Sequence, residues 1–348
     1  MFAYEQMSRH WLRRVTSNIV KGLPVTGNFI IRKEKVMSHL MDLSAYEFGG
    51  ASNNNHLADL DEFGSNPGGL NAKIYIPADL PAGAPLVVVL HGCKQTAAKY
   101  DEGAGWSEIA DQYGVALLFP EQRRLNNWLL GFNWFKPSDS NRGAGEPLSI
   151  LHMVEQVVRD HGIDPERIFI TGLSAGGAMT SVMLATYPEI FAGGAIIAGL
   201  PYGSAYTTLA ALRRMKGRGS PTAQQLETRL RNASAHEGPW PTLSVWHGSC
   251  DHTVDASNAN AILGQWRALH DLEKKPSSTH IINGYPRRVW SDVEGHDLIE
   301  EYNISGMGHG TPLKTHGKKS YGSRGAFMLD VNISSTRHIA DFWGLSAA

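Results

Sequence analysis

A serine, an aspartate and a histidine occur along this sequence in settings that suit nucleophilic catalysis. Ser174 lies in Gly172-Leu-Ser-Ala-Gly176, between an apolar run that predicts a buried strand and a segment that predicts a helix. A sharp glycine-flanked turn between strand and helix is typical of a nucleophile elbow, which exposes the serine hydroxyl beside helical N–H groups. An ordinary strand–helix turn is the alternative. The combination of strand, glycines and helix favours the catalytic interpretation.

Ser174 requires a base, because a serine hydroxyl is scarcely ionised at neutral pH. His309 lies later in the chain in Gly306-Met-Gly-His-Gly310, where the glycines allow a histidine loop to reach over a sheet. Asp251 directly follows a predicted strand and can orient the imidazole. Asp255 is the rival carboxylate, and a helix N-cap is the alternative role for either. The order Ser174, Asp251, His309 is that of α/β-hydrolase triads, and we predict these roles for the three residues.

Other histidines compete with His309 for the role of base, and several are expected at the surface or behind the site. They are His91, His247, His252, His296 and His316. His309 is favoured because it follows the aspartate and lies between glycines.

Two backbone N–H groups are predicted to stabilise the oxyanion. In this arrangement they belong to the residue after the nucleophile and to a loop after an earlier strand, which here are Ala175 and Cys93. An ordinary strand-end turn is the alternative for Cys93. A second nucleophile at Cys93 is disfavoured, because no neighbour in sequence marks an activated thiolate. A disulfide with Cys250 is disfavoured as well, because two intervening strands would separate the pair by roughly 14 Å.

Alternating strands and helices must position these residues. Apolar β-branched runs predict strands at 72–76, 86–90, 115–120, 167–170, 194–198 and 242–246. Amphipathic or apolar segments predict helices at 106–113, 147–161, 177–185, 209–215, 224–231, 256–272 and 334–343. The alternation predicts an α/β fold with a mostly parallel central sheet and helices on both faces. Ligands bind such sheets at the carboxyl ends of the strands, where the candidate residues fall.

The chain divides into an N-terminal extension, residues 1–55, and a catalytic domain, residues 56–348. The extension is predicted to be helical and packed on the main domain, with a membrane-surface helix as the alternative. An insertion at about residues 200–240 could cover the site as a lid or pack alongside it. The long polar and aromatic stretch 123–145 is of a length that is usually functional. Candidate substrate contacts are Trp128, Trp134 and His91, with a structural hydrophobic role equally open for the tryptophans.

The composition is that of an ordinary globular protein, with 42% hydrophobic and 19% charged residues. A formal net charge of −1 argues against an extended nucleic-acid surface. No apolar run is long enough to span a bilayer, and no secretory signal is visible, so a cytoplasmic location is expected. No His/Asp/Glu cluster shows metal-ligand spacing, and neither a metal nor a cofactor is predicted. The oligomeric state is left open.

Several separated motifs resemble those of the polyhydroxybutyrate depolymerase family of esterases, in the same order. They are Phe63–Gly68, His91–Thr96, Asn133–Phe135, Arg142–Glu146, Gly172–Gly177, Trp246–Gly248 with Asp251 and Thr253–Val254, Gly306–Gly310 and Ile333–Thr336. The resemblance implies an α/β-hydrolase fold and hydrolysis of short-chain polyhydroxyalkanoates or related esters. It also implies the triad Ser174, Asp251 and His309, with the Cys93 amide in the oxyanion hole, and it leaves secretion open.

Two other functions are weighed beside this one. The first is a feruloyl or acetyl esterase that acts on plant polysaccharide, because related sequences share the triad context. The second, of another class, is a catalytically inactive binding protein of hydrolase fold. The presence of serine, aspartate and histidine in order argues against the second.

Overall fold

The computed structural model describes residues 56–347. The N-terminal extension predicted for residues 1–55 lies outside the described residues. Among the residues that are described, no helix is both long and apolar enough to cross a membrane.

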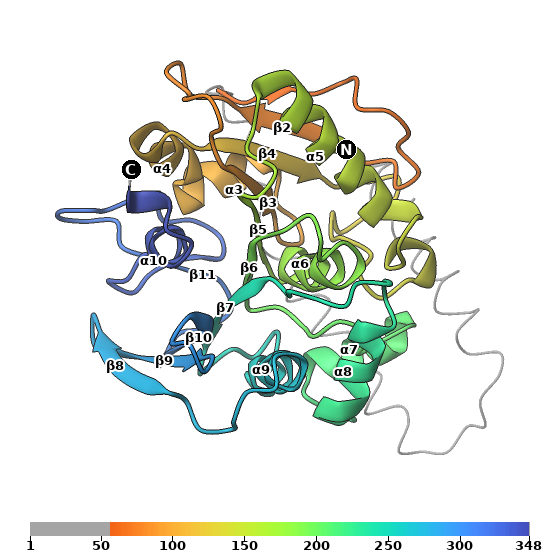
Figure 1. The fold of residues 1–348 in the computed structure, drawn as a ribbon, viewed down its shortest axis with the longest axis vertical. Helices are drawn as coiled ribbons and strands as arrows, with labels where there is room; N and C mark the ends of the chain where they lie inside the picture. Colours follow the sequence, from red (N-terminus) through yellow and green to blue (C-terminus); the bar gives the residue numbers. More distant parts are fainter. Residues whose placement is uncertain (1–55, 348) are drawn as a thin grey trace, which may run out of the picture. The chain divides into compact units, whose positions relative to one another are not determined.

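A ten-stranded sheet forms the centre of the described structure (Figure 1). The strands are β1 (Ala58–Asp59), β2 (Asn71–Tyr75), β3 (Leu86–Leu90), β4 (Ala116–Glu121), β5 (Ile168–Leu173), β6 (Gly193–Ile197), β7 (Thr242–Gly248), β8 (Ser278–Ile282), β9 (Tyr285–Ser291) and β10 (Asp297–Ile304). Their order in the sheet is β1-β2-β4-β3-β5-β6-β7-β10-β9-β8. The six strands from β4 to β10 are mutually parallel, whereas β1, β2, β9 and β8 pair antiparallel at the two sides. The predicted mostly parallel sheet is confirmed.

Helices cover both faces of this sheet. They are α3 (Ala97–Ala104), α4 (Trp106–Tyr113), α5 (Gly145–His161), α6 (Ala175–Thr186), α7 (Thr208–Met215), α8 (Ala223–Arg231), α9 (Ser257–Leu269) and α10 (Ser335–Phe342), with short 3-10 turns at Pro137–Asp139 and Leu345–Ala347. In Figure 1, α5, α6 and α9 lie on one side of the sheet, and α4 and α10 lie on the other. A short parallel pair, β11 (Thr311–Leu313) and β12 (Met328–Asp330), follows β10.

The central strand β3 shows why two hydrophobic cores form. Its five residues are all buried, and successive side chains point to opposite faces, as in any strand. Leu86, Val88 and Leu90 join the core with α5, α6 and α9. Val87 and Val89 join the core with α3, α4 and α10. A strand covered on both faces is therefore apolar at every position.

The insertion between β6 and β7 contributes α7 and α8 to the helical layer. In α8, Leu226 and Leu230 are fully buried, and Leu230 belongs to the core shared with α6 and α9. Gln265 of α9 donates a hydrogen bond to the carbonyl oxygen of Leu226 at 2.8 Å. Of the two arrangements left open by the sequence, α8 adopts the one that packs alongside the helices.

Candidate active site

The turn between β5 and α6 places Ser174 at the carboxyl edge of the sheet. Its backbone has φ 57° and ψ −113°, a conformation that costs about 1–3 kcal/mol for a residue with a side chain. The neighbouring glycines allow the tight turn. A Cβ on Gly176 would lie 2.3 Å from the carbonyl oxygen of Leu90, and one on Gly172 would lie 2.5 Å from the carbonyl carbon of Gly176. The elbow packs directly on the end of β3, which explains the glycine pattern.

Ser174, His309 and Asp251 are brought together in one hydrogen-bonded series. Ser174 Oγ lies 2.9 Å from His309 Nε2, and His309 Nδ1 lies 2.6 Å from Asp251 Oδ2. Because a carboxylate only accepts, Nδ1 donates to Asp251 and Nε2 is left to accept from the serine hydroxyl. All three side chains are largely buried, and the arrangement is suited to removing a proton from Ser174.

Asp251 is held as an ionised carboxylate by several N–H donors. Its Oδ1 accepts from the backbone N–H groups of Thr253 and Val254, both at 2.8 Å. Burial alone would raise its pKa, but hydrogen bonds from His247 and His309 hold the pKa of Asp251 well below its usual range. The carboxylate can therefore stabilise a positively charged imidazolium next to it.

The loops that carry Asp251 and His309 are joined by backbone hydrogen bonds. The N–H of Cys250 donates to the carbonyl oxygen of Met307 at 2.9 Å, and that of Ser249 donates to Ile304 at 3.0 Å. Gly248 is the close-approach point, since a Cβ there would lie 2.3 Å from the Met307 oxygen. Because β7 and β10 are parallel neighbours, both loops leave the same edge of the sheet.

The rival residues at this edge have other roles. Asp255 Oδ1 accepts from the N–H of Ser257, the first residue of α9, at 2.9 Å, while the N-cap position itself is occupied by Ala256. His252 is exposed, and the His316 side chain is 82% exposed. Of the competing histidines, His247 is the one that contacts Asp251.

The side chains of Cys93 and Ala175, the residues predicted to supply the oxyanion donors, both lie close to Gly131. Cys93 follows β3, and Ala175 is the first residue of α6. Gly131 fits between them, because a Cβ at that position would lie 2.5 Å from Cys93 Sγ and 3.5 Å from Ala175 Cβ. Burial raises the pKa of the Cys93 thiol to about 11, so the side chain stays protonated and is a poor nucleophile. Cys93 and Cys250 are both free thiols.

His91 is placed differently from the expectation that it contacts substrate. It is 1% exposed, its Nδ1 pairs with the carbonyl oxygen of Gly92 at 2.8 Å, and its Nε2 accepts from the N–H of Gln122 at 3.1 Å. Burial lowers the pKa of the His91 imidazole, which favours the neutral form. His91 therefore connects the loop after β3 to the end of β4 through hydrogen bonds, in the protein interior.

The two candidate tryptophans differ in environment. Trp128 is 55% exposed, on the loop whose Leu129 carbonyl accepts from the N–H of Lys94 beside Cys93. Trp134 is 8% exposed and packs edge-on against Phe135 within the hydrophobic core. The structural alternative holds for Trp134, while Trp128 is open to solvent near the site.

A buried carboxyl group organises the loop that contains Gly131, and the sequence motifs alone do not indicate this role. Glu146, in the first turn of α5, is 0% exposed. Its carboxylate accepts from Gln122 Nε2 at 2.6 Å, from Asn133 Nδ2 at 2.7 Å and from the Asn133 backbone N–H at 2.8 Å. Gln122 Nε2 also donates to the carbonyl oxygen of Gly131 at 3.2 Å. In the sequence, Glu146 and Asn133 are marked only by their membership of motifs that carry the family resemblance.

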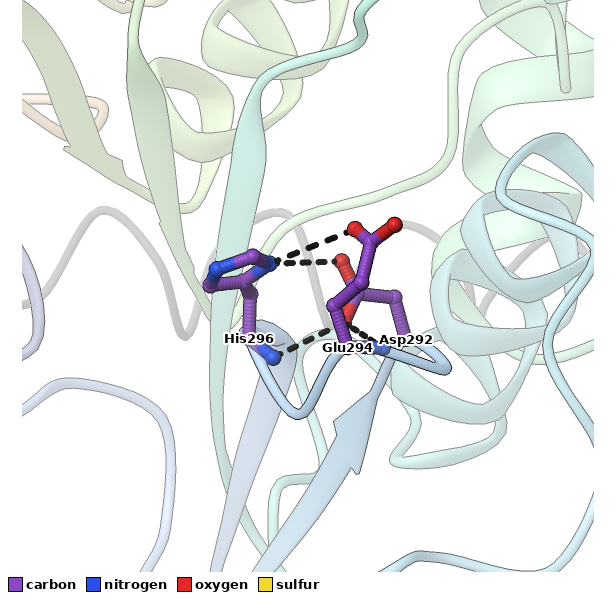
Figure 2. Close-up of side chains that lie close together, drawn as sticks. All are labelled: Asp292, Glu294 and His296. Atoms are coloured by element: carbon purple, nitrogen blue, oxygen red, sulfur yellow. Dashed lines mark hydrogen bonds and ion pairs between the residues drawn. The ribbon is translucent and has the colours of Figure 1, made fainter.

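One cluster in the described part of the chain could hold a metal ion, contrary to the sequence expectation. The ligand atoms of Asp292, Glu294 and His296 lie within 4.8 Å of one another, and Figure 2 shows the His296 ring facing both carboxylates across the β9–β10 turn. This turn precedes β10, so it lies at the edge of the sheet opposite to Ser174. Asp292 Oδ1 also accepts from the backbone N–H groups of Glu294 and His296. These bonds account for the cluster as a turn-stabilising arrangement.

Comparison with known proteins gives a consistent set of relatives. Residues 70–275 match the family model described as esterase PHB depolymerase, a stretch that includes Cys93, Ser174 and Asp251. The chain is 43% identical over 291 residues to poly(3-hydroxyalkanoate) depolymerase C of Paucimonas lemoignei, covering 83% of this chain and 70% of that protein. It is 30% identical over 264 residues to feruloyl esterase B of Talaromyces funiculosus, covering 74% and 73%.

A solved structure shares the fold at lower sequence identity. It is the acetyl xylan esterase from Aspergillus awamori, with a TM-score of 0.71, 23% identity, and coverage of 83% of this chain and 99% of that one. Together with the strand order described above, this similarity confirms the α/β-hydrolase fold predicted from the sequence.

Proposed function

This chain belongs to the PHB depolymerase family of esterases, and from that membership we propose that it hydrolyses poly(3-hydroxyalkanoate) chains or their oligomers. As a member of the family it is a carboxylic ester hydrolase. The substrate class is proposed from the 43% identity to a poly(3-hydroxyalkanoate) depolymerase.

The proposed mechanism has two steps and uses an acyl-enzyme. Ser174 attacks the ester carbonyl while His309 takes its proton, and Asp251 stabilises the imidazolium that forms. The N–H groups of Ala175 and Cys93 stabilise the oxyanion. His309 then protonates the leaving alcohol and later activates the water that releases the acid. The single observation that supports these roles most is the hydrogen-bonded series from Ser174 Oγ through His309 to Asp251.

Replacement of the nucleophile tests this mechanism. The Ser174→Ala variant is expected to lose about 10⁶-fold in kcat on p-nitrophenyl butyrate while it keeps the thermal unfolding profile of the wild type. A fluorophosphonate should label the wild type at Ser174 and leave the variant unlabelled. Retained turnover in the Ser174→Ala variant would refute the assignment of Ser174 as nucleophile. If the fluorophosphonate does not label the wild type, the alternative of a catalytically inactive binding protein would be favoured.

A second ester class is favoured by one specific observation, the 30% identity to a feruloyl esterase. The two classes are separated by the ratio of kcat/KM on 3-hydroxybutyrate oligomers and on methyl ferulate. We expect the oligomers to be the better substrates. A preference for methyl ferulate would assign the chain to the second class and leave the serine mechanism intact.

A further inference from the structure

His247 lies directly behind the carboxylate proposed to orient the catalytic histidine. It is the penultimate residue of β7 and is 3% exposed. Its Nε2 lies 2.8 Å from the carbonyl oxygen of Val254 and 3.4 Å from Asp251 Oδ2. That carboxylate oxygen is the same one that receives the hydrogen bond from His309 Nδ1.

The chemistry of the partners fixes where the His247 proton is. The Val254 carbonyl oxygen can only accept, so Nε2 carries the hydrogen and donates it to that oxygen, while Asp251 Oδ2 lies 3.4 Å from the same nitrogen. Val254 in turn donates its own N–H to Asp251 Oδ1 at 2.8 Å. His247 thereby ties the end of β7 to both ends of the Asp251–Val254 turn. The imidazole is too buried to reach substrate.

We propose that His247 is a positioning residue, whose N–H holds the Asp251–Val254 turn so that the carboxylate faces His309. The proposal rests on the proposed function, in which Asp251 orients the base. The bond to Val254 fixes the turn, and the contact with Asp251 withdraws electron density from the carboxylate. Without this N–H, the carboxylate would attract a proton on His309 more strongly.

The other charged groups around Asp251 come from three elements. His309 comes from the loop after β10, and Asp255 lies just before α9. Lys216, which follows α7, donates to the carbonyl oxygen of His252. These groups are the same in every variant below, so a change in pH dependence between variants reports the His247 N–H.

Two substitutions at one position separate positioning from packing. His247→Phe fills a similar volume without the N–H, whereas the amide of His247→Gln can place an N–H near the original Nε2. In the Phe variant, kcat on p-nitrophenyl butyrate should fall about ten- to a hundredfold with little change in KM, because a turn that is no longer held misplaces the carboxylate that orients His309. The acid limb of its kcat/KM profile should move to higher pH. The Gln variant should recover most of kcat and return the limb towards its wild-type position.

All rates are taken per active site, counted by stoichiometric reaction of Ser174 with a fluorophosphonate, so that a misfolded fraction does not enter kcat. If the Phe variant does not fold, His247→Asn removes the same bond, since its shorter side chain cannot reach Val254. The proposal is overturned if His247→Phe and His247→Asn keep the wild-type kcat and the wild-type acid limb of the kcat/KM profile. It is also overturned if His247→Gln loses as much kcat as these two variants while the acid limb stays in its wild-type position. Failure of the proposed function is a separate outcome, seen as retained turnover in Ser174→Ala.

Discussion

Gly131 lies against Cys93 and Ala175, the proposed oxyanion donors, with no room for a side chain. A methyl group there would lie 2.5 Å from Cys93 Sγ, which is well inside contact distance. We expect Gly131→Ala to push the Cys93 backbone away from Ala175 and to lower kcat on p-nitrophenyl butyrate by about tenfold or more, because small misplacements of catalytic groups are costly. The backbone of Gly131 does not adopt a positive φ, so the loss would come from the contact alone.

The contact itself can be removed as a control. Cys93→Ala should change kcat little, because the proposed role of this residue belongs to its backbone N–H. The double variant Gly131→Ala with Cys93→Ala should then regain most of the activity lost in the single Gly131 variant. If the double variant stays as slow as Gly131→Ala, steric displacement of Cys93 is not the cause.

Catalytic roles could be predicted from the sequence for residues that lie in a recognisable local pattern, such as the end of a strand. Roles that depend on a partner far away in the sequence could not be predicted. Ser174 and Asp251 directly follow apolar strands, and His309 lies in a glycine-rich loop, so each can be recognised locally. His91 has no such signature, because its partner Gln122 lies 31 residues away at the end of another strand. A histidine after a strand is compatible both with substrate contact and with a buried bond between loops.

At the scale of secondary-structure elements, the first turn of α5 anchors the loop beneath the site. Removal of the Glu146 carboxylate would leave three buried N–H donors on Gln122 and Asn133 without their acceptor, at about 1–3 kcal/mol each. We predict that Glu146→Ala lowers the free energy of unfolding by at least about 2 kcal/mol. It should also lower kcat, because the same loop presents Gly131 to Cys93.

Glu155→Ala is the matched control on the same helix, since Glu155 is exposed. Urea unfolding and p-nitrophenyl butyrate kinetics should show both losses for Glu146→Ala and neither for Glu155→Ala. Faster cleavage of the 122–133 loop by a protease under native conditions would locate the effect. Equal stability of the two variants would contradict the anchoring role of Glu146.

The elements predicted from the sequence are those with continuous apolar or amphipathic patterns. Strand β3 and helix α4 have the predicted bounds, while α6 begins two residues before the predicted start because the elbow turn is so tight. The sequence patterns predict none of β8, β9 and β10, which complete one side of the sheet. In β9, Arg287 pairs with Glu300 of β10, and Arg288 pairs with Glu301. Strands held by such charged pairs lack the apolar run that marks a buried strand.

At the scale of the described molecule, buried carboxyl groups and buried histidines change the free energy of unfolding in opposite directions as the pH falls. Burial raises the pKa of Glu146 to about 8 and that of Glu300 to about 7, so these carboxyls favour the folded state as the pH falls towards the ordinary carboxyl range. Burial lowers the pKa of His270 and His338 to about 4. The net pH dependence of stability is therefore a difference between opposing contributions, and a comparison of variants is needed to isolate one group.

His338 offers such a comparison. It lies on α10 against the stacked rings of Trp246 and Tyr302. Its folded pKa of about 4 is below the unfolded value of 6.5, so the unfolded chain binds the extra proton between these limits. Above pH 6.5, His338 therefore does not lower the free energy of unfolding. As the pH falls from 6.5 towards 4, it lowers this free energy progressively.

His338→Gln cannot take up this proton, so its stability relative to the wild type should rise as the medium is acidified. We expect a gain on the order of 1–2 kcal/mol between pH 7 and pH 4.5, reduced from the full linkage value because the side chain is partly exposed. Urea unfolding at a series of pH values measures the gain, and His280→Gln, an exposed position on β8, is the control. A constant difference between His338→Gln and wild type across this range would show that His338 is not held neutral by burial, and the acid sensitivity would then have to come from other groups.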